Sequence, residues 1–145
     1  MNTQTYIVET PARLDEAAAQ IISLAKQFPI IALYGSLGAG KTTLVQTICK
    51  LMELETEATS PTFTIVQTYR KNQEDAVYHF DLYRIENTDQ LFAIGYEEYF
   101  DSGCPCFIEW PENAGSLLPY PHLHVDVEEQ DNSFRKISIS LIQTP

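Results

Sequence analysis

The residues best suited to chemistry in this chain form a glycine-rich loop that ends in lysine and threonine. The segment Gly35-Ser36-Leu37-Gly38-Ala39-Gly40-Lys41-Thr42 satisfies the pattern G-x-x-x-x-G-K-S/T at every position. Glycines let the backbone curl until successive N–H groups point at phosphate oxygens. The lysine supplies a mobile positive charge for the β- and γ-phosphates, and the threonine hydroxyl is a ligand for Mg2+. The motif therefore predicts a P-loop that binds ATP with Mg2+.

The segments on either side of the loop are those that a P-loop requires. Residues 30–34 form a continuous apolar run of strand length, which is typical of a strand buried on both faces. Residues 42–51 have apolar side chains at helical spacing, so a helix is expected to begin at the loop and to add its positive end to the phosphate site. A glycine turn before an ordinary helix is the alternative, and the complete motif with these flanks argues against it.

A P-loop also needs a carboxylate at the end of a neighbouring strand, to hold Mg2+ or one of its waters. Glu109 ends the apolar run at residues 106–108, as expected at the carboxyl edge of a sheet, where α/β folds bind ligands. Asp81 lies in an alternating strand on the same side as His79 and Tyr83. Spacing leaves open whether Asp81 is a site residue or part of the polar face of a half-exposed hairpin.

Residues 59–63 lie between the P-loop helix and the next expected strand, where the nucleotide-sensing loops of P-loop switches often lie. The hydroxyl groups of this segment are candidates to contact the γ-phosphate or the metal, and a plain turn before a strand is the alternative. The histidines lack the spacing of metal ligands, and we expect His122 and His124 on the surface of a strand.

The remaining elements predict the architecture. A strand at residues 6–8 precedes a helix that Thr10 caps and Pro11 begins. Residues 63–69 and 77–83 are typical of a hairpin, as are residues 122–127 and 134–141, and residues 86–99 look helical with a break at Gly95. Antiparallel hairpins in a P-loop protein imply a mixed sheet. We therefore expect an α/β fold: a single P-loop NTPase-like domain over residues 1–145, with three layers and a mixed central sheet flanked by helices.

The composition and charge of the chain limit the kinds of partner that it is expected to bind. Twenty acidic and nine basic side chains give a formal net charge of −11, which repels a phosphate backbone, so direct binding of DNA or RNA is not expected. No apolar stretch reaches the ~18 residues of a membrane span, and residues 1–10 lack a signal-peptide layout. A cytoplasmic protein with no membrane partner is expected. The three cysteines have neither zinc nor redox spacing and are expected to be reduced packing residues.

Taken together, the motifs resemble one family, the small bacterial ATPases of threonylcarbamoyladenosine biosynthesis known as TsaE. The matching stretches are residues 35–43, 60–63, 79–84, 95–100 and 108–112, in the same order and spacing over most of the chain. The sequences HFDLYR at 79–84 and EWPE at 109–112 make the match specific. The family usually has Asp where this chain has Ser36.

The resemblance implies a weak Mg2+-dependent ATPase, activated by partners, that works with the two other proteins of the bacterial threonylcarbamoyl-transfer complex. It would be required to form the threonylcarbamoyl group on the adenosine next to the anticodon in tRNAs that read codons starting with A. It would reach tRNA only indirectly, through those proteins.

The resemblance also assigns roles to residues. It implies that Thr42 and Glu109 hold Mg2+ and that Asp81 lies in the active site. From the chemistry of the motif we also predict that Lys41 helps to spread the charge that develops on the γ-phosphate, and that Asp81 or Thr62 orients the attacking water. The nucleotide would be bound by Gly35, Leu37, Gly38, Ala39, Gly40, Lys41, Thr42, Thr43 and Arg135.

Other functions of P-loop proteins fit the sequence less well or stay open. A P-loop small-molecule kinase, the main alternative, needs an arginine-rich lid, whereas Arg13, Arg70, Arg84 and Arg135 are scattered along the chain. A GTP-operated switch usually carries an N-K-x-D segment, which this sequence lacks. A nucleotide-binding subunit without turnover stays open, because sequence does not fix the placement of the attacking water.

Overall fold

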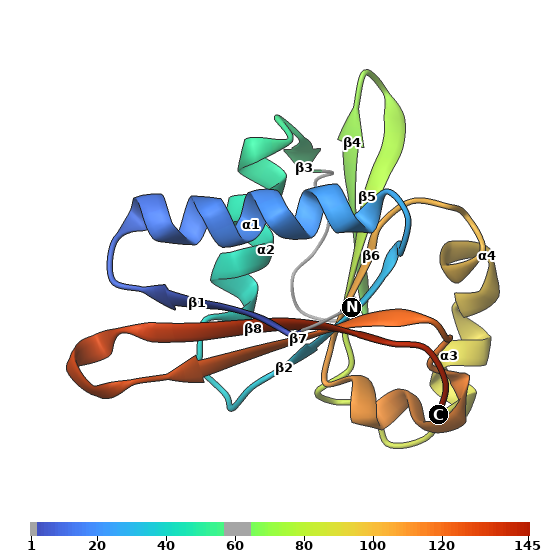
Figure 1. The fold of residues 1–145 in the computed structure, drawn as a ribbon. Coiled ribbons are helices and arrows are strands. Elements are labelled where there is room, and N and C mark those ends of the chain that lie inside the picture. The colour runs from blue at the N-terminus through green and yellow to red at the C-terminus, as the bar shows by residue number, and fades with distance from the viewer. Residues whose placement is uncertain (1–2, 57–64) are drawn as a thin grey trace.

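The computed structural model describes residues 3–56 and 65–145, whose strands form one eight-stranded sheet in the order β1-β8-β7-β2-β6-β5-β4-β3 (Figure 1). The strands are β1 (Gln4–Val8), β2 (Ile30–Tyr34), β3 (Glu55–Thr56), β4 (Val66–Lys71), β5 (Glu74–Asp81), β6 (Cys106–Glu109), β7 (His122–Glu129) and β8 (Arg135–Ile142). The helices are α1 (Pro11–Ala25), α2 (Lys41–Leu51), α3 (Asp89–Ala93) and α4 (Tyr96–Phe100), with 3-10 turns η1 (Pro111–Leu117) and η2 (Asp131–Ser133).

The sheet is mixed, as the two hairpins predicted. The central strand β2 runs parallel to β6 and to β7, and β5 runs parallel to β6. The outer strands are antiparallel: β4 pairs with β5 and with β3 on one side, and β8 pairs with β7 and with β1 on the other. Parallel pairing in the centre brings the carboxyl ends of β2, β5 and β6 to the same edge of the sheet.

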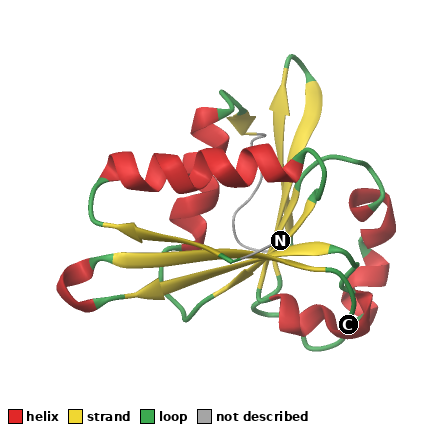
Figure 2. Ribbon diagram, in the orientation of Figure 1, coloured by secondary structure: helices red, strands yellow, loops and turns green. Residues whose placement is uncertain are grey.

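Helices, red in Figure 2, cover both faces of the yellow sheet and give the three expected layers. On one face, α1 and α2 pack over β2 side chains that include Ile31 and Leu33. On the other face, α3, α4 and η1 pack over Ile30 and Ala32. Strand β2 is therefore buried on both sides, which explains why its sequence is apolar without alternation.

The two long helices begin as their sequences predict. The Oγ1 atom of Thr10 accepts a hydrogen bond from the N–H of Arg13 at 3.3 Å, and Pro11 occupies the first turn of α1. Helix α2 begins directly after Gly40, whose φ of 111° is a left-handed conformation that glycine adopts readily. The start of α2 is thus fixed at the phosphate loop.

The β4–β5 hairpin is tighter than the sequence predicted. A polar segment at residues 70–75 lies between the predicted strands at 63–69 and 77–83, but in the structure Arg70 pairs with Asp75 and Lys71 with Glu74. Only Asn72 and Gln73 form the turn, with φ values of 54° and 67°. Such a two-residue turn matches the twist of the paired strands and extends both of them.

Two further expectations have clear outcomes. Gly95, with φ of 71°, separates α3 from α4, so the predicted break is confirmed. The surface position predicted for His122 is wrong: its exposed fraction is 2%, and its Nδ1 atom lies 2.8 Å from the carbonyl oxygen of Pro119. An alternating pattern shows that a strand has a polar and an apolar face, but it does not show whether other segments of the same chain cover the polar face.

Within the described residues, none of the helices has the length and apolar character needed to cross a membrane.

Candidate active site

The candidate site lies at the carboxyl edge of the three parallel strands. Gly35 directly follows β2, Glu109 ends β6, and Asp81 ends β5. The register aligns Leu33 with Glu109 and Glu109 with Asp81, so the loop after β2 and the two carboxylates are neighbours. This edge is where ligands bind in α/β sheets.

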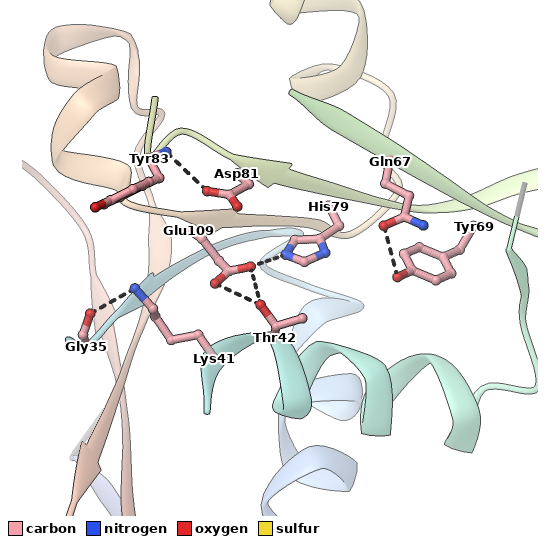
Figure 3. A network of polar contacts seen from close by, with 9 residues as sticks. All are labelled: Gly35, Lys41, Thr42, Gln67, Tyr69, His79, Asp81, Tyr83 and Glu109. Carbon is pink, nitrogen blue, oxygen red and sulfur yellow. Dashed lines mark hydrogen bonds and ion pairs between the residues drawn. The ribbon is translucent and has the colours of Figure 1, made fainter. Parts of the chain in front are cut away.

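The side chain of Lys41 folds back over the loop. Its Nζ atom donates a hydrogen bond to the carbonyl oxygen of Gly35 at 2.8 Å and lies 3.8 Å from the ring centroid of Trp110 (Figure 3 shows the first contact). Burial lowers the pKa of Lys41, although the negative charges of Glu109, Glu112 and Asp81 oppose this effect. The ammonium group is thus a desolvated cation, whose attraction to an anion is stronger than it would be in water.

The carboxylate of Glu109 is buried and has polar partners on two sides. The Thr42 hydroxyl lies 3.0 Å from Oε2 and 3.2 Å from Oε1 of Glu109, and it can donate to either oxygen. His79 Nε2 lies 2.6 Å from Oε2 (Figure 3). Burial by itself would raise the pKa of Glu109. The hydrogen bond and charge of His79, the Thr42 hydroxyl and the Lys41 charge together outweigh burial and lower it.

A cavity of about 240 Å³ opens between these groups. Asp81 lies at its rim, where Oδ1 accepts a hydrogen bond from the backbone N–H of Tyr83 at 3.1 Å. The ring of Tyr83 lies 5.1 Å from that of Trp110, so two aromatic side chains form one wall. The lining residues are Leu37, Gly38, Gly40, Lys41, Thr42, Thr43, Asp81, Tyr83, Glu109 and Trp110.

The C-terminal hairpin holds the loop from behind. Gly35 has a φ of 148°, and a Cβ atom added there would lie 2.5 Å from the carbonyl oxygen of Val127 in β7, so only glycine fits without a shift. Arg135 of β8 donates from Nε to the carbonyl oxygen of Ala39 at 2.7 Å. The loop is therefore packed between α2 and the β7–β8 hairpin.

The structure brings most of the predicted site residues together. Lys41, Thr42, Asp81 and Glu109 all line the cavity, and so do four other residues predicted to bind the nucleotide: Leu37, Gly38, Gly40 and Thr43. The other three residues predicted to bind the nucleotide lie at the back of the loop. Gly35 packs closely against the Val127 carbonyl, and the Ala39 carbonyl accepts the hydrogen bond from Arg135. Thr62 and the rest of the predicted sensing segment lie outside the described residues.

Sequence reasoning missed two features of the site. The first is the contact of Trp110 with Lys41, for which proximity to Glu109 in the sequence was the only signal. The second is the pair of His79 and Glu109. Alternation placed His79 on the same side of the strand as Asp81, but the pairing also requires the register between β5 and β6.

The residues present fit a metal-bound phosphate chain. The hydroxyl of Thr42 and the carboxylate of Glu109 are adjacent oxygen donors, the ligand type that Mg2+ prefers, and the lowered pKa of Glu109 favours its ionised form. Lys41 and the N–H groups at the start of α2 supply positive potential at the same cavity.

This strand, loop and helix, set in a mixed three-layer sheet, define a P-loop NTPase-like protein. A family model described as "Threonylcarbamoyl adenosine biosynthesis protein TsaE" matches residues 8–137. The chain therefore belongs to the TsaE family.

Individual relatives agree with this assignment, and each is named "tRNA threonylcarbamoyladenosine biosynthesis protein TsaE". The Rickettsia bellii protein is 35% identical over 141 residues, which cover 97% of this chain and 96% of that protein. The Rickettsia conorii protein is 40% identical over 111 residues, covering 76% of this chain but 62% of the relative's length. A crystal structure of Bacillus subtilis YdiB has the same fold, with a TM-score of 0.72 and 24% identity, and covers 97% of this chain and 86% of that one.

Proposed function

We propose that this chain is a weak Mg2+-dependent ATPase that serves the formation of threonylcarbamoyladenosine in tRNA, the process for which its relatives are named. The observation that carries the proposal is the convergence of Lys41, Thr42 and Glu109 on one cavity beside a P-loop. The proposed unit is a single domain over residues 1–145.

The protein's own groups have separable roles in this proposal. Lys41 binds the β- and γ-phosphates: its ammonium has three N–H groups, of which Gly35 takes one. Thr42 and Glu109 hold Mg2+, which when bound neutralises charge that develops on the phosphates. The loop N–H groups orient the phosphate chain. Asp81, at the rim of the cavity, accepts a hydrogen bond from the attacking water and so orients it, with Thr62 as the other candidate.

Turnover is expected to be slow without partners, since no arginine is among the described residues that line the cavity. Arg13 pairs with Glu16, and the guanidinium of Arg135 bonds to the loop backbone. An arginine supplied by a partner can raise phosphoryl-transfer rates by roughly a thousandfold or more. The proposed partners are the two other proteins of the threonylcarbamoyl-transfer complex.

Exposed apolar side chains at the cavity support docking of a partner there. Leu37, in the loop, is 72% exposed, and Tyr83, which also lines the cavity, is 51% exposed. Large exposed side chains that rim a site are typical of protein interfaces. The net charge of −11 disfavours direct contact with tRNA, so we propose that the chain acts on tRNA only through its partners, in the cytoplasm.

The test is ATP hydrolysis by the purified chain with Mg2+, first alone and then with the two partner proteins and tRNA. Slow hydrolysis that rises when the partners are added supports the proposal. A rate that the partners leave unchanged contradicts the accessory role. Transfer of phosphate to a small acceptor, without hydrolysis in either setting, would replace the proposal with a kinase.

A further inference from the structure

His79 takes part in a buried polar pair that the P-loop motif does not require. It comes from β5, whereas Glu109 comes from the neighbouring β6, and Figure 3 shows the imidazole directed at the carboxylate. The side chains are 8% and 6% exposed, and Nε2 of His79 lies 2.6 Å from Oε2 of Glu109. Water therefore has little access to either partner.

The pair replaces an apolar surface at this point of the sheet. Two residues earlier in each strand, and so on the same face of the sheet, Val77 and Phe107 belong to the hydrophobic core. Burying two polar groups carries a desolvation cost, and apolar side chains of similar size often stabilise a fold as well or better. Stability alone therefore does not account for a histidine and a glutamate here.

The two carboxylate oxygens of Glu109 have different surroundings. Oε2 is contacted by His79 at 2.6 Å and by Thr42 at 3.0 Å, whereas Oε1 has only the longer Thr42 contact, at 3.2 Å, among the described residues. The imidazole thus fixes one oxygen and leaves the other with spare acceptor capacity. A carboxylate held in this way cannot rotate without breaking its shortest contact.

We propose that His79 is a positioning residue of the metal site: its Nε2 atom holds Oε2 of Glu109, so that Oε1 remains available to Mg2+ or to a metal-bound water. The inference rests on the proposed function, since it assigns a role within the same site. Groups that orient metal ligands in this way commonly change metal affinity by about 10–100-fold when they are removed.

Three substitutions separate positioning from filling of space. The side-chain amide nitrogen of Gln reaches about as far as Nε2 of histidine, whereas that of Asn reaches only as far as Nδ1. His79→Gln can therefore restore the contact with Glu109, while His79→Asn keeps a polar group but falls short of Oε2. His79→Leu removes the contact and preserves apolar packing.

The measurement is the Mg2+ concentration that gives half-maximal binding of a non-hydrolysable ATP analogue, with the midpoint of thermal unfolding measured for each variant. We expect His79→Leu and His79→Asn to need about 10–100 times more Mg2+ than wild type, and His79→Gln to stay within a few-fold of it. Binding of the analogue in EDTA should be the same for all four proteins, because the Lys41 side of the site is unchanged.

Two results would overturn the inference while the proposed function stands. One is an unchanged Mg2+ requirement in His79→Leu, and the other is equal behaviour of the Gln and Asn variants. If His79→Leu does not fold, the comparison of Gln with Asn still decides. A wild-type chain that binds the analogue equally well with Mg2+ and in EDTA overturns the metal site itself, and with it the role of His79.

Discussion

The hydroxyl of Thr42 lies 3.0 Å from Oε2 of Glu109, although 67 positions separate the two residues in the sequence. The parallel pairing of β2 with β6 produces this proximity. It aligns Leu33 with Glu109, two positions before the loop begins. The two oxygen donors thus belong to one site because of strand register, and each can be tested separately.

Removing the Thr42 hydroxyl is expected to weaken metal use. Thr42→Val should raise the Mg2+ concentration needed for binding of an ATP analogue about tenfold or more, because a polar contact to a charged group is worth roughly 1.5–3 kcal/mol. Thr42→Ser keeps the hydroxyl and should resemble wild type. Thr47→Val is the matched control, since Thr47 lies on the same helix and bonds to the carbonyl oxygen of Thr43 instead. A Val variant with an unchanged requirement would remove Thr42 from the metal site.

Removing the Lys41 ammonium should weaken nucleotide binding itself. We expect Lys41→Ala to lower affinity for ATP roughly 10–100-fold, as the loss of one charge-assisted contact implies. Calorimetric titration measures this change. Lys50→Ala removes the same charge from an exposed position at the other end of α2 and should have little effect. Equal losses in the two variants would point to general electrostatics rather than to a phosphate contact.

Trp110 should report on nucleotide binding. It is the one tryptophan of the chain, and the ammonium of Lys41 lies 3.8 Å from its ring centroid. Because the phosphates of a bound nucleotide would attract the same ammonium group, saturating nucleotide is expected to change the fluorescence emission of Trp110. Lys41→Ala should change the emission without ligand and reduce the response to it. No spectral change at a nucleotide concentration that calorimetry shows to be saturating would contradict this coupling.

The sequence was sufficient to predict the parts of the site that depend on local spacing. The loop from Gly35 to Thr42, its helix and the acid at Glu109 follow from motif and periodicity. The contact of His79 with Glu109 does not, because it depends on how β5 and β6 align. The contact of Arg135 with Ala39 likewise depends on the packing of the last hairpin, and no local pattern encodes it.

Two loop glycines should differ in their tolerance of a methyl group. Gly35→Ala is expected to destabilise the fold strongly, by roughly 1–3 kcal/mol from backbone strain and more from the close contact with the carbonyl of Val127. At Gly38, φ is 82° but nothing lies within 4 Å of an added Cβ, so Gly38→Ala should cost only about 1–2 kcal/mol. Urea denaturation measures both values. A larger loss in Gly38→Ala would contradict the packing of β7 against Gly35.

Two of the three cysteines should resist alkylation in the native protein. Burial raises the pKa of Cys49 to about 12, and burial, with a smaller effect of Cys104, raises that of Cys106 to about 12. At pH 8 only roughly one thiol in 10,000 would then be the reactive thiolate. Iodoacetamide followed by mass spectrometry should therefore label half-buried Cys104 first, and all three cysteines in denaturant. Rapid native labelling of Cys49 or Cys106 would contradict their burial.

The hydrogen bond from Arg135 to Ala39 also has a consequence for biosynthesis. The loop emerges from the ribosome long before β8, yet β8 provides Arg135 and also pairs with β1 from the start of the chain. Contacts between such distant segments form late, because the intervening chain must first be ordered. A nascent chain that stops short of β8 would carry the complete nucleotide motif. It would lack both the hydrogen bond from Arg135 to the loop and the strand with which β1 pairs. The loop therefore reaches its supported form only after β8 has been synthesised.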